Sequence, residues 1–233
     1  MLYNFLKNLI PLESRKTWNR KKRALLRGKK QKIFCVGFNK TGTTSLGRAM
    51  SDLGYSVGDQ KIAENLHAGY LQRNFRKIIR HSMTADFFQD IPYSCPFTFV
   101  ALDLNFKDAK FILTVRDSSE QWYNSITKFH TLKWGKNGNL PTKEDLKEAD
   151  YVFKGYPWIM NRIMFQSPEE SPYNRKVLIA AYERHIENVK EYFKDRPESL
   201  LILNVAEDGA YQKLARFLNT KTDKVDFPWL KKT

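Results

Sequence analysis

Residues 32–53 read KIFCVGFNKTGTTSLGRAMSDL, and this stretch decides the fold. It opens with the continuous apolar run Lys32 to Gly37, which is typical of a buried parallel strand. A loop follows, and then Thr43 starts a segment with hydroxyl residues suited to a helix N-terminus. Its apolar residues recur at helical spacing, as Leu46, Ala49, Met50 and Leu53. Strand, loop and helix in this order predict a phosphate site.

Two further apolar runs predict strands, over residues 110–115 and 200–204. Amphipathic patterns predict helices over 176–193 and 211–218, a helix capped by Asp117 or Ser118, and one from Thr142 to about Phe153. Alternating strands and helices favour a parallel sheet covered on both faces. We therefore expect one α/β domain over residues 32–233, with three α/β/α layers and a central, mainly parallel sheet, preceded by a basic N-terminal arm over residues 1–31.

The charge is strongly positive but unevenly distributed. The chain has 233 residues and a formal net charge of +15, and ten of the eighteen residues 15–32 are Lys or Arg. This excess favours an anionic partner. The arm suits peripheral contact with an anionic membrane, or it is a solvated basic helix or disordered lead. Its apolar start ends at Pro11, well short of the roughly 20 residues that a membrane span needs. Only two cysteines are present, which favours a reducing, cytoplasmic compartment.

The loop Gly37-Phe-Asn-Lys-Thr-Gly42 has the glycine spacing of a nucleotide-triphosphatase P-loop, but Thr43 stands where that motif requires lysine. The lysine is Lys40, inside the loop. Glycines that admit close backbone approach, a helix N-terminus and successive hydroxyls still form a cradle for an anion.

This loop, with Lys-Thr-Gly-Thr-Thr-Ser over residues 40–45, resembles the 5′-phosphosulfate loop of sulfotransferases that use 3′-phosphoadenosine 5′-phosphosulfate (PAPS). The resemblance extends over roughly residues 32–229 and implies PAPS as co-substrate. It assigns nucleotide binding to Asn39, Lys40, Thr41, Gly42, Thr43, Thr44 and Ser45.

The same resemblance implies a 3′-phosphate site made by Arg116 and Ser125. Arginine suits this role because its planar head can hold two phosphate oxygens. The family usually places the serine eight residues after the arginine, and here the separation is nine. An extra residue before the helix would absorb the difference; otherwise Asn124 or Ser118 takes the role.

Transfer to a hydroxyl requires a proton acceptor. Asp90, in a segment similar to the family's Asp-x-Pro element, is the first candidate, followed by Asp86 and then a histidine, of which His185 recurs in the family's late helix. Lys40 would stabilise the charge on the bridging oxygen. No metal-ligand spacing is evident in the sequence. A set of aromatic residues could form the acceptor site or belong to the core: Trp134, Tyr151, Phe153, Tyr156, Trp158, Phe165 and Tyr173.

The sequence therefore favours a sulfotransferase that acts on a hydroxyl or amine of a small molecule or glycan. Two alternatives stay open: a nucleotide kinase or NTPase with a degenerate loop, and a non-catalytic anion-binding module. Thr43 argues against the first alternative. Nucleic acid is not expected as a partner.

Overall fold

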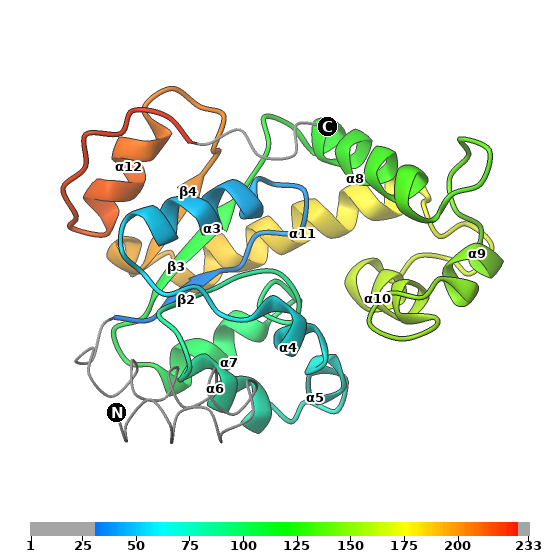
Figure 1. The fold of residues 1–233 in the computed structure, drawn as a ribbon, viewed down its shortest axis with the longest axis horizontal. Coiled ribbons are helices and arrows are strands. Elements are labelled where there is room, and N and C mark those ends of the chain that lie inside the picture. Colours follow the sequence, from blue (N-terminus) through cyan, green and yellow to red (C-terminus); the bar gives the residue numbers. More distant parts are fainter. Residues whose placement is uncertain (1–30, 228–233) are drawn as a thin grey trace, which may run out of the picture.

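A computed structural model describes residues 31–227 of the chain (Figure 1). The arm predicted for residues 1–30, with its membrane contact, and the end of the chain from residue 228 lie outside the described residues. Among the described residues, four strands form one sheet in the order β2-β1-β3-β4, and every strand pair is parallel. The strands are β1 (Ile33–Cys35), β2 (Phe87–Phe88), β3 (Lys110–Thr114) and β4 (Leu200–Leu203).

Helices cover both faces of this sheet, because side chains alternate along each strand. On one face, Ile33 and Cys35 of β1 pack with α3 (Thr43–Asp52) and α12 (Ala210–Phe217). On the other face, Phe34 and Phe111 belong to a larger core that includes α7 (Thr98–Asn105) and α11 (Arg175–Phe193). Figure 1 shows α3 and α12 on the opposite side of the sheet from α7. The expected three-layer α/β/α fold is confirmed.

The remaining helices belong to the larger core. They are α4 (Gln60–Glu64), α5 (His67–Leu71), α6 (Arg76–Ser82), α8 (Ser119–Trp134), α9 (Lys143–Glu148) and α10 (Tyr156–Phe165), and the short 3₁₀ helix η1 (Pro197–Ser199) precedes β4. Helices α8 and α11 contact each other, as do α9 and α10. Figure 1 shows α8, α9 and α10 together on one side of the molecule.

Several boundaries differ from the sequence expectation. Strand β1 ends at Cys35 rather than at Gly37, and β3 and β4 each end one residue early. Thr142 caps α9 through a reciprocal capping box with Asp145, as expected. The helix nevertheless ends at Glu148 and not near Phe153, because the chain turns extended at Ala149 and forms a bridge between Asp150 and Lys154.

Strand β2 and helices α4 to α6 were not anticipated from the sequence. Phe87 and Phe88 are both buried, one on each face of the sheet, so a two-residue strand has no alternation to detect. Helices α4 and α5 have five residues each and α6 has seven, which is too short for a clear helical period.

His185 of α11 is a buried support for the strand that carries the loop. Its Nε2 lies 2.7 Å from the carbonyl oxygen of Val36, and its ring stacks on Phe38 at 4.3 Å between centroids. Burial lowers the pKa of His185 to about 4, while the contact with Val36 acts weakly in the opposite direction. The imidazole is therefore neutral at physiological pH and donates to the Val36 carbonyl.

This burial predicts a specific loss of stability in mild acid. The unfolded chain binds a proton at His185 near pH 6.5 and the native chain only near pH 4, so unfolding is favoured as the pH falls through this window. Between pH 7 and 5 the native state should lose about 2 kcal/mol through this residue. Urea denaturation at both pH values should show that His185→Gln, although less stable at pH 7, has a shallower pH dependence than wild type. Equal pH dependence in the two proteins would contradict this account.

Candidate functional site

The site lies where the loops after β1 and β3 diverge. Strand β1 leads into α3 on one face of the sheet, and β3 leads into α8, whose Trp122 and Ile126 belong to the core on the other face. Open parallel sheets bind ligands beyond the carboxyl ends of the strands at such a reversal. Because β1 pairs with both β2 and β3, its loop lies between Asp90, after β2, and Arg116, after β3.

The loop after β1 requires glycine at both ends. A Cβ on Gly37 would lie 2.1 Å from Thr114 Oγ1 and 2.5 Å from the Thr114 carbonyl oxygen, so only glycine fits this close to β3. Gly42 has φ of 95° and is the N-cap of α3. The first N–H groups of α3 have no partner within the helix, and they point with the helix dipole toward this loop. Backbone N–H groups at a helix N-terminus are the kind of group that binds anions in proteins.

The hydroxyls of this segment differ in their surroundings. Thr41 is fully buried, and its Oγ1 donates to the Phe38 carbonyl at 2.5 Å and lies 2.6 Å from Thr114 Oγ1. Its hydroxyl therefore braces the loop, and its backbone N–H is the group left to face an anion. Thr43 and Ser45 are buried at the start of α3, and Thr44 is half-buried there. Asn39 contributes a buried side-chain oxygen that has no hydrogen-bond partner among the described residues.

Two side chains from the β3–α8 segment hold the loop by its backbone carbonyls. Trp122 Nε1 donates to the Asn39 carbonyl at 3.1 Å, and Arg116 Nε donates to the Lys40 carbonyl at 2.6 Å. Trp122 is itself fixed by stacking on Tyr182 of α11, with ring centroids 4.5 Å apart and planes 3° from parallel. The Tyr182 hydroxyl accepts from the Arg116 backbone N–H at 3.1 Å. The loop, the arginine and α8 therefore form one rigid unit.

Lys40 occupies a left-handed backbone conformation, with φ of 71°. A residue with a Cβ pays roughly 1–2 kcal/mol for this conformation, and such strain is concentrated at functional sites. The Lys40 ammonium lies 4.4 Å from the centroid of the Phe129 ring of α8. The loop thus directs its cation toward the face of α8 that also carries Trp122.

The two candidate aspartates lie at opposite ends of strand β2. Asp86 precedes β2, and its Oδ2 accepts from the backbone N–H and the hydroxyl of Ser56, at 2.9 and 2.6 Å. This residue holds the segment before β2 in place, at the edge away from Lys40. Asp90 follows β2, at the carboxyl ends of the strands, where the loop after β1 also lies. Its own backbone is left-handed, with φ of 55°, which aspartate tolerates better than most residues.

Helix α8 begins between Arg116 and Ser125. Ser118 is the N-cap, and its hydroxyl accepts from the Gln121 N–H at 3.1 Å. Ser125 is buried on the same side of α8 as Trp122, whereas Asn124 is exposed. Of the three candidates, Ser125 therefore lies on the face that meets the loop.

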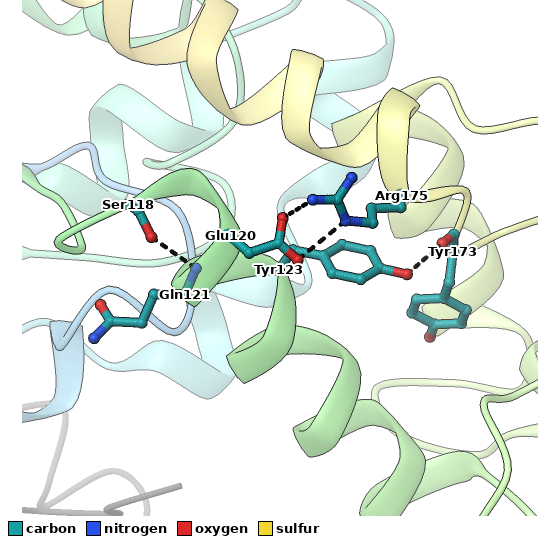
Figure 2. Close-up of polar contacts among 6 residues, drawn as sticks. All are labelled: Ser118, Glu120, Gln121, Tyr123, Tyr173 and Arg175. Carbon is teal, nitrogen blue, oxygen red and sulfur yellow. Dashed lines mark hydrogen bonds and ion pairs between the residues drawn. The ribbon is translucent and has the colours of Figure 1, made fainter.

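Helix α8 is clamped to the start of α11 on its other side. Figure 2 shows Glu120 facing Arg175 and the Tyr123 hydroxyl reaching toward Tyr173. The Arg175 Nε lies 3.0 Å from Glu120 Oε1, its second nitrogen pairs with Oε2, and Tyr123 donates to the Tyr173 carbonyl at 3.0 Å. Both side chains of this ion pair are largely exposed and screened by solvent, so the packing of α8 against α11 contributes more to the position of α8.

The two histidines near the site are neutral, and His185 is buried whereas His130 is partly buried. His130 lies beside the site, its Nδ1 2.9 Å from the Tyr173 hydroxyl. Burial lowers its pKa to about 3, and the charges of Lys133 and Lys40 act in the same direction. His185 holds the start of the loop, as described above.

The aromatic residues considered for an acceptor site fall into two groups. Tyr156, Phe165 and Tyr173 are buried core residues, whereas Tyr151 and Phe153 are 45% and 36% exposed. Trp134 and Trp158 are partly buried against the core. Sequence reasoning missed Glu64, whose Oε1 accepts from the Tyr151 hydroxyl at 3.0 Å. It lies in a short helix that carries no motif, so no sequence signal indicated it.

A family model described as a sulfotransferase domain matches residues 32–233. No curated protein matched the chain. Within residues 31–227, no group of three or more His, Cys, Asp or Glu side chains could hold a metal ion, and no helix there is long and apolar enough to cross a membrane.

The hydrogen bond between Trp122 and the Asn39 carbonyl can be removed while the ring stack is kept. Trp122→Phe should lower the free energy of unfolding by about 1–3 kcal/mol, because a buried carbonyl loses its donor and the smaller ring leaves a gap. Chemical denaturation followed by circular dichroism measures this change. Trp158→Phe, on α10, is the matched control and should cost less. A Trp122→Phe protein as stable as wild type would show that the bond does not hold the loop.

Proposed function

The chain belongs to the sulfotransferase family, and we propose that it transfers a sulfuryl group from PAPS to a hydroxyl, or an amine, of a small molecule or glycan. One observation supports PAPS as the donor: Arg116 donates a hydrogen bond to the backbone carbonyl of Lys40. The two positively charged side chains are thereby held together, and we assign Lys40 to the 5′-phosphosulfate and Arg116 to the 3′-phosphate. We further propose that the enzyme works in the cytoplasm, with peripheral membrane contact through residues 1–31, and without nucleic acid as a partner.

The loop fits the 5′-phosphosulfate end of PAPS. Gly37 and Gly42 allow the backbone to approach an anion, and the N-terminus of α3 supplies N–H donors for phosphate oxygens. The hydroxyls of Thr44 and Ser45 and the side-chain NH₂ of Asn39 are further donor groups in the same segment. We assign the backbone N–H groups of Thr41 and Thr43 as further hydrogen-bond donors to the phosphate oxygens.

Arg116 and Ser125 are assigned to the 3′-phosphate. The Nε of Arg116 is engaged by the Lys40 carbonyl, and its terminal nitrogens can bind phosphate oxygens in its planar, bidentate mode. The carboxylate of the neighbouring Asp117 accepts instead from Gln121, at 2.6 Å, and from Asn204. The arginine is thus oriented by the loop rather than by the adjacent acid.

In the chemical step, the acceptor oxygen attacks sulfur in line with the bond to the phosphate oxygen. Asp90 takes the acceptor proton as the new bond forms. Lys40 lies in the loop where negative charge develops on the departing phosphate oxygen, and a fixed cation stabilises that charge without reorganisation. Lys40 and Asp90 both lie at the carboxyl edge of the sheet, on neighbouring segments.

The structure offers little support for a triphosphatase. Asp103, the aspartate that would have to bind Mg²⁺, lies in α7 and not at the end of a strand. Its carboxylate accepts from the Tyr192 hydroxyl at 2.8 Å and pairs with Arg196 at 2.9 Å. A purely anion-binding role would rest on the basic residues 1–30, whereas residues 31–227 hold 28 Lys and Arg against 24 Asp and Glu.

Nucleotide preference tests the proposed donor. Adenosine 3′,5′-bisphosphate should raise the melting temperature well above the shift given by AMP or by ATP with Mg²⁺, because Arg116 and Ser125 recognise a 3′-phosphate that both lack. Differential scanning fluorimetry at equal ligand concentrations measures the shifts. Ser125→Ala should narrow the gap between the bisphosphate and AMP, and Asn124→Ala, on the exposed face, is its control. Equal shifts from bisphosphate and ATP would refute PAPS as the donor.

Lys40 and Asp90 should affect turnover more than nucleotide binding. Lys40→Ala should lower kcat about 10²–10³-fold, and Lys40→Arg should recover only part of this because a wider planar head does not reproduce a compact ammonium. Alanine carries the same backbone strain as lysine, so stability should change little.

Asp90→Asn should lower kcat about 10²–10⁴-fold with the bisphosphate affinity retained. Single-turnover transfer from radiolabelled PAPS measures the rate of the chemical step, and titration with the bisphosphate measures nucleotide affinity. Variants of Lys40 and Asp90 that transfer at the wild-type rate would contradict the roles proposed for these two residues.

A further inference from the structure

Three aromatic rings surround the ammonium group of Lys133. Its Nζ lies 3.5 Å from the ring centroid of Tyr151, 4.9 Å from that of Trp134 and 5.5 Å from that of Phe129. Phe129 and Trp134 belong to α8, and Tyr151 to the segment between α9 and α10. Ring faces within about 6 Å attract a cation, and several rings together form the kind of cage that recognises ammonium ligands. We call these three residues the aromatic cage.

A carboxylate adjoins the aromatic cage. Glu64, the last residue of α4, is half-buried, and its Oε1 accepts from the Tyr151 hydroxyl at 3.0 Å. Burial raises the pKa of Glu64, although the bond from Tyr151 and the charge of Lys133 oppose that shift. A partly desolvated carboxylate beside aromatic faces supplies the counter-charge that a bound ammonium group needs.

The aromatic cage lies next to the proposed catalytic groups. The ring of Phe129 is shared, because the Lys40 ammonium also lies 4.4 Å from its centroid. Burial raises the pKa of Tyr151 to about 12, and the charges of Glu64 and Asp90 act in the same direction.

Helix α8 sets the order of these groups. Ser125, Phe129 and Lys133 follow at four-residue spacing, so they lie along one face of the helix with about 6 Å between successive residues. The first is assigned to the nucleotide, the second contacts Lys40, and the third sits in the aromatic cage. A molecule held in the cage would therefore lie on the far side of Lys40 from the 3′-phosphate site, where an acceptor belongs.

The charge of the donor favours a cation at this position. A bound bisphosphorylated nucleotide brings several negative charges beside the cage, and they outweigh the two positive charges of Lys40 and Arg116. Lys133 is exposed and long, so its ammonium can leave the cage at the cost of a rotamer change. Building on the proposed function, we propose that the aromatic cage and Glu64 bind the ammonium group of the acceptor, an alcohol that carries a positively charged amine, and that Lys133 occupies the cage until this acceptor displaces it.

The transfer step balances with this acceptor. Its hydroxyl oxygen forms a bond to sulfur, the bond between sulfur and the phosphate oxygen breaks, and the electron pair stays on the bisphosphate product. The hydroxyl proton passes to the Asp90 carboxylate. The ammonium group takes no part in the chemistry and only positions the hydroxyl.

Choline and 3,3-dimethylbutan-1-ol form a matched pair of probes, since they share shape and hydroxyl and differ in the positive charge. Titration calorimetry with the full chain, with and without adenosine 3′,5′-bisphosphate, should show tighter binding of choline. Lys133→Ala should tighten choline binding by about 2- to 30-fold, because the internal competitor is gone. Lys128→Ala, which removes the same charge from an exposed position of α8, is the control and should change the affinity much less.

Variants of Tyr151 distinguish the contribution of its ring from that of its hydroxyl, which donates to Glu64. Tyr151→Leu should weaken choline binding by about 2- to 30-fold, whereas Tyr151→Phe keeps the ring and should bind nearly as wild type. Glu64→Gln should weaken choline binding and leave that of the neutral alcohol unchanged.

The results distinguish this inference from the proposed function. If the bisphosphate binds but choline and the neutral alcohol bind equally, or if Lys133→Ala fails to tighten choline binding, the acceptor proposal is overturned while the sulfotransferase donor stands. If choline follows the expected pattern in the absence of nucleotide and the bisphosphate does not bind, the cage stands and the proposed donor is wrong.

Discussion

The backbone carbonyls of Asn39 and Lys40 are held from the side by Trp122 and Arg116, and the arrangement of the site depends on these two hydrogen bonds. Both bonds engage carbonyl oxygens of the loop, so its backbone N–H groups take no part in these two contacts. The same bonds keep Lys40 in its left-handed conformation, which would otherwise relax. The energy of packing a tryptophan against Tyr182 is thus used to fix the backbone geometry of the loop.

The support behind the loop is rigid because it is buried and neutral. His185 is kept uncharged by burial and holds the Val36 carbonyl. Burial raises the pKa of the Cys35 thiol to about 12, and its sulfur lies 3.6 Å from Thr114 Oγ1. Thr114 in turn meets the Thr41 hydroxyl. A loop fixed in this way can present a cation to a developing charge without first reorganising, which is where electrostatic catalysis gains most.

Positive charge in the site is distributed over separated positions. Arg116 contacts the backbone of Lys40, and the ammonium groups of Lys40 and Lys133 both lie within about 6 Å of the Phe129 ring centroid. The negative face of an aromatic ring attracts an ammonium group, so this ring offsets part of the repulsion between the two lysines. His130 beside these two lysines does not add a further charge, because burial and both ammonium groups lower its pKa.

The sequence by itself determined the strand, loop and helix over residues 32–53, the parallel α/β class and the distinction from a triphosphatase, because each depends on local order: an apolar run, two glycines and the position of one lysine. It also placed Arg116 at the end of a strand. Only the tertiary structure decided which aspartate lies near the loop. Asp86 and Asp90 are four residues apart, and the two-residue strand β2 between them places Asp86 at the amino ends of the strands and Asp90 at the carboxyl ends. Which of Ser125 and Asn124 lies on the buried face of α8 likewise depends on where the helix begins, at the Ser118 cap. The pairing of Glu64 with Tyr151 joins segments 87 residues apart, and no local pattern records a contact made by packing alone.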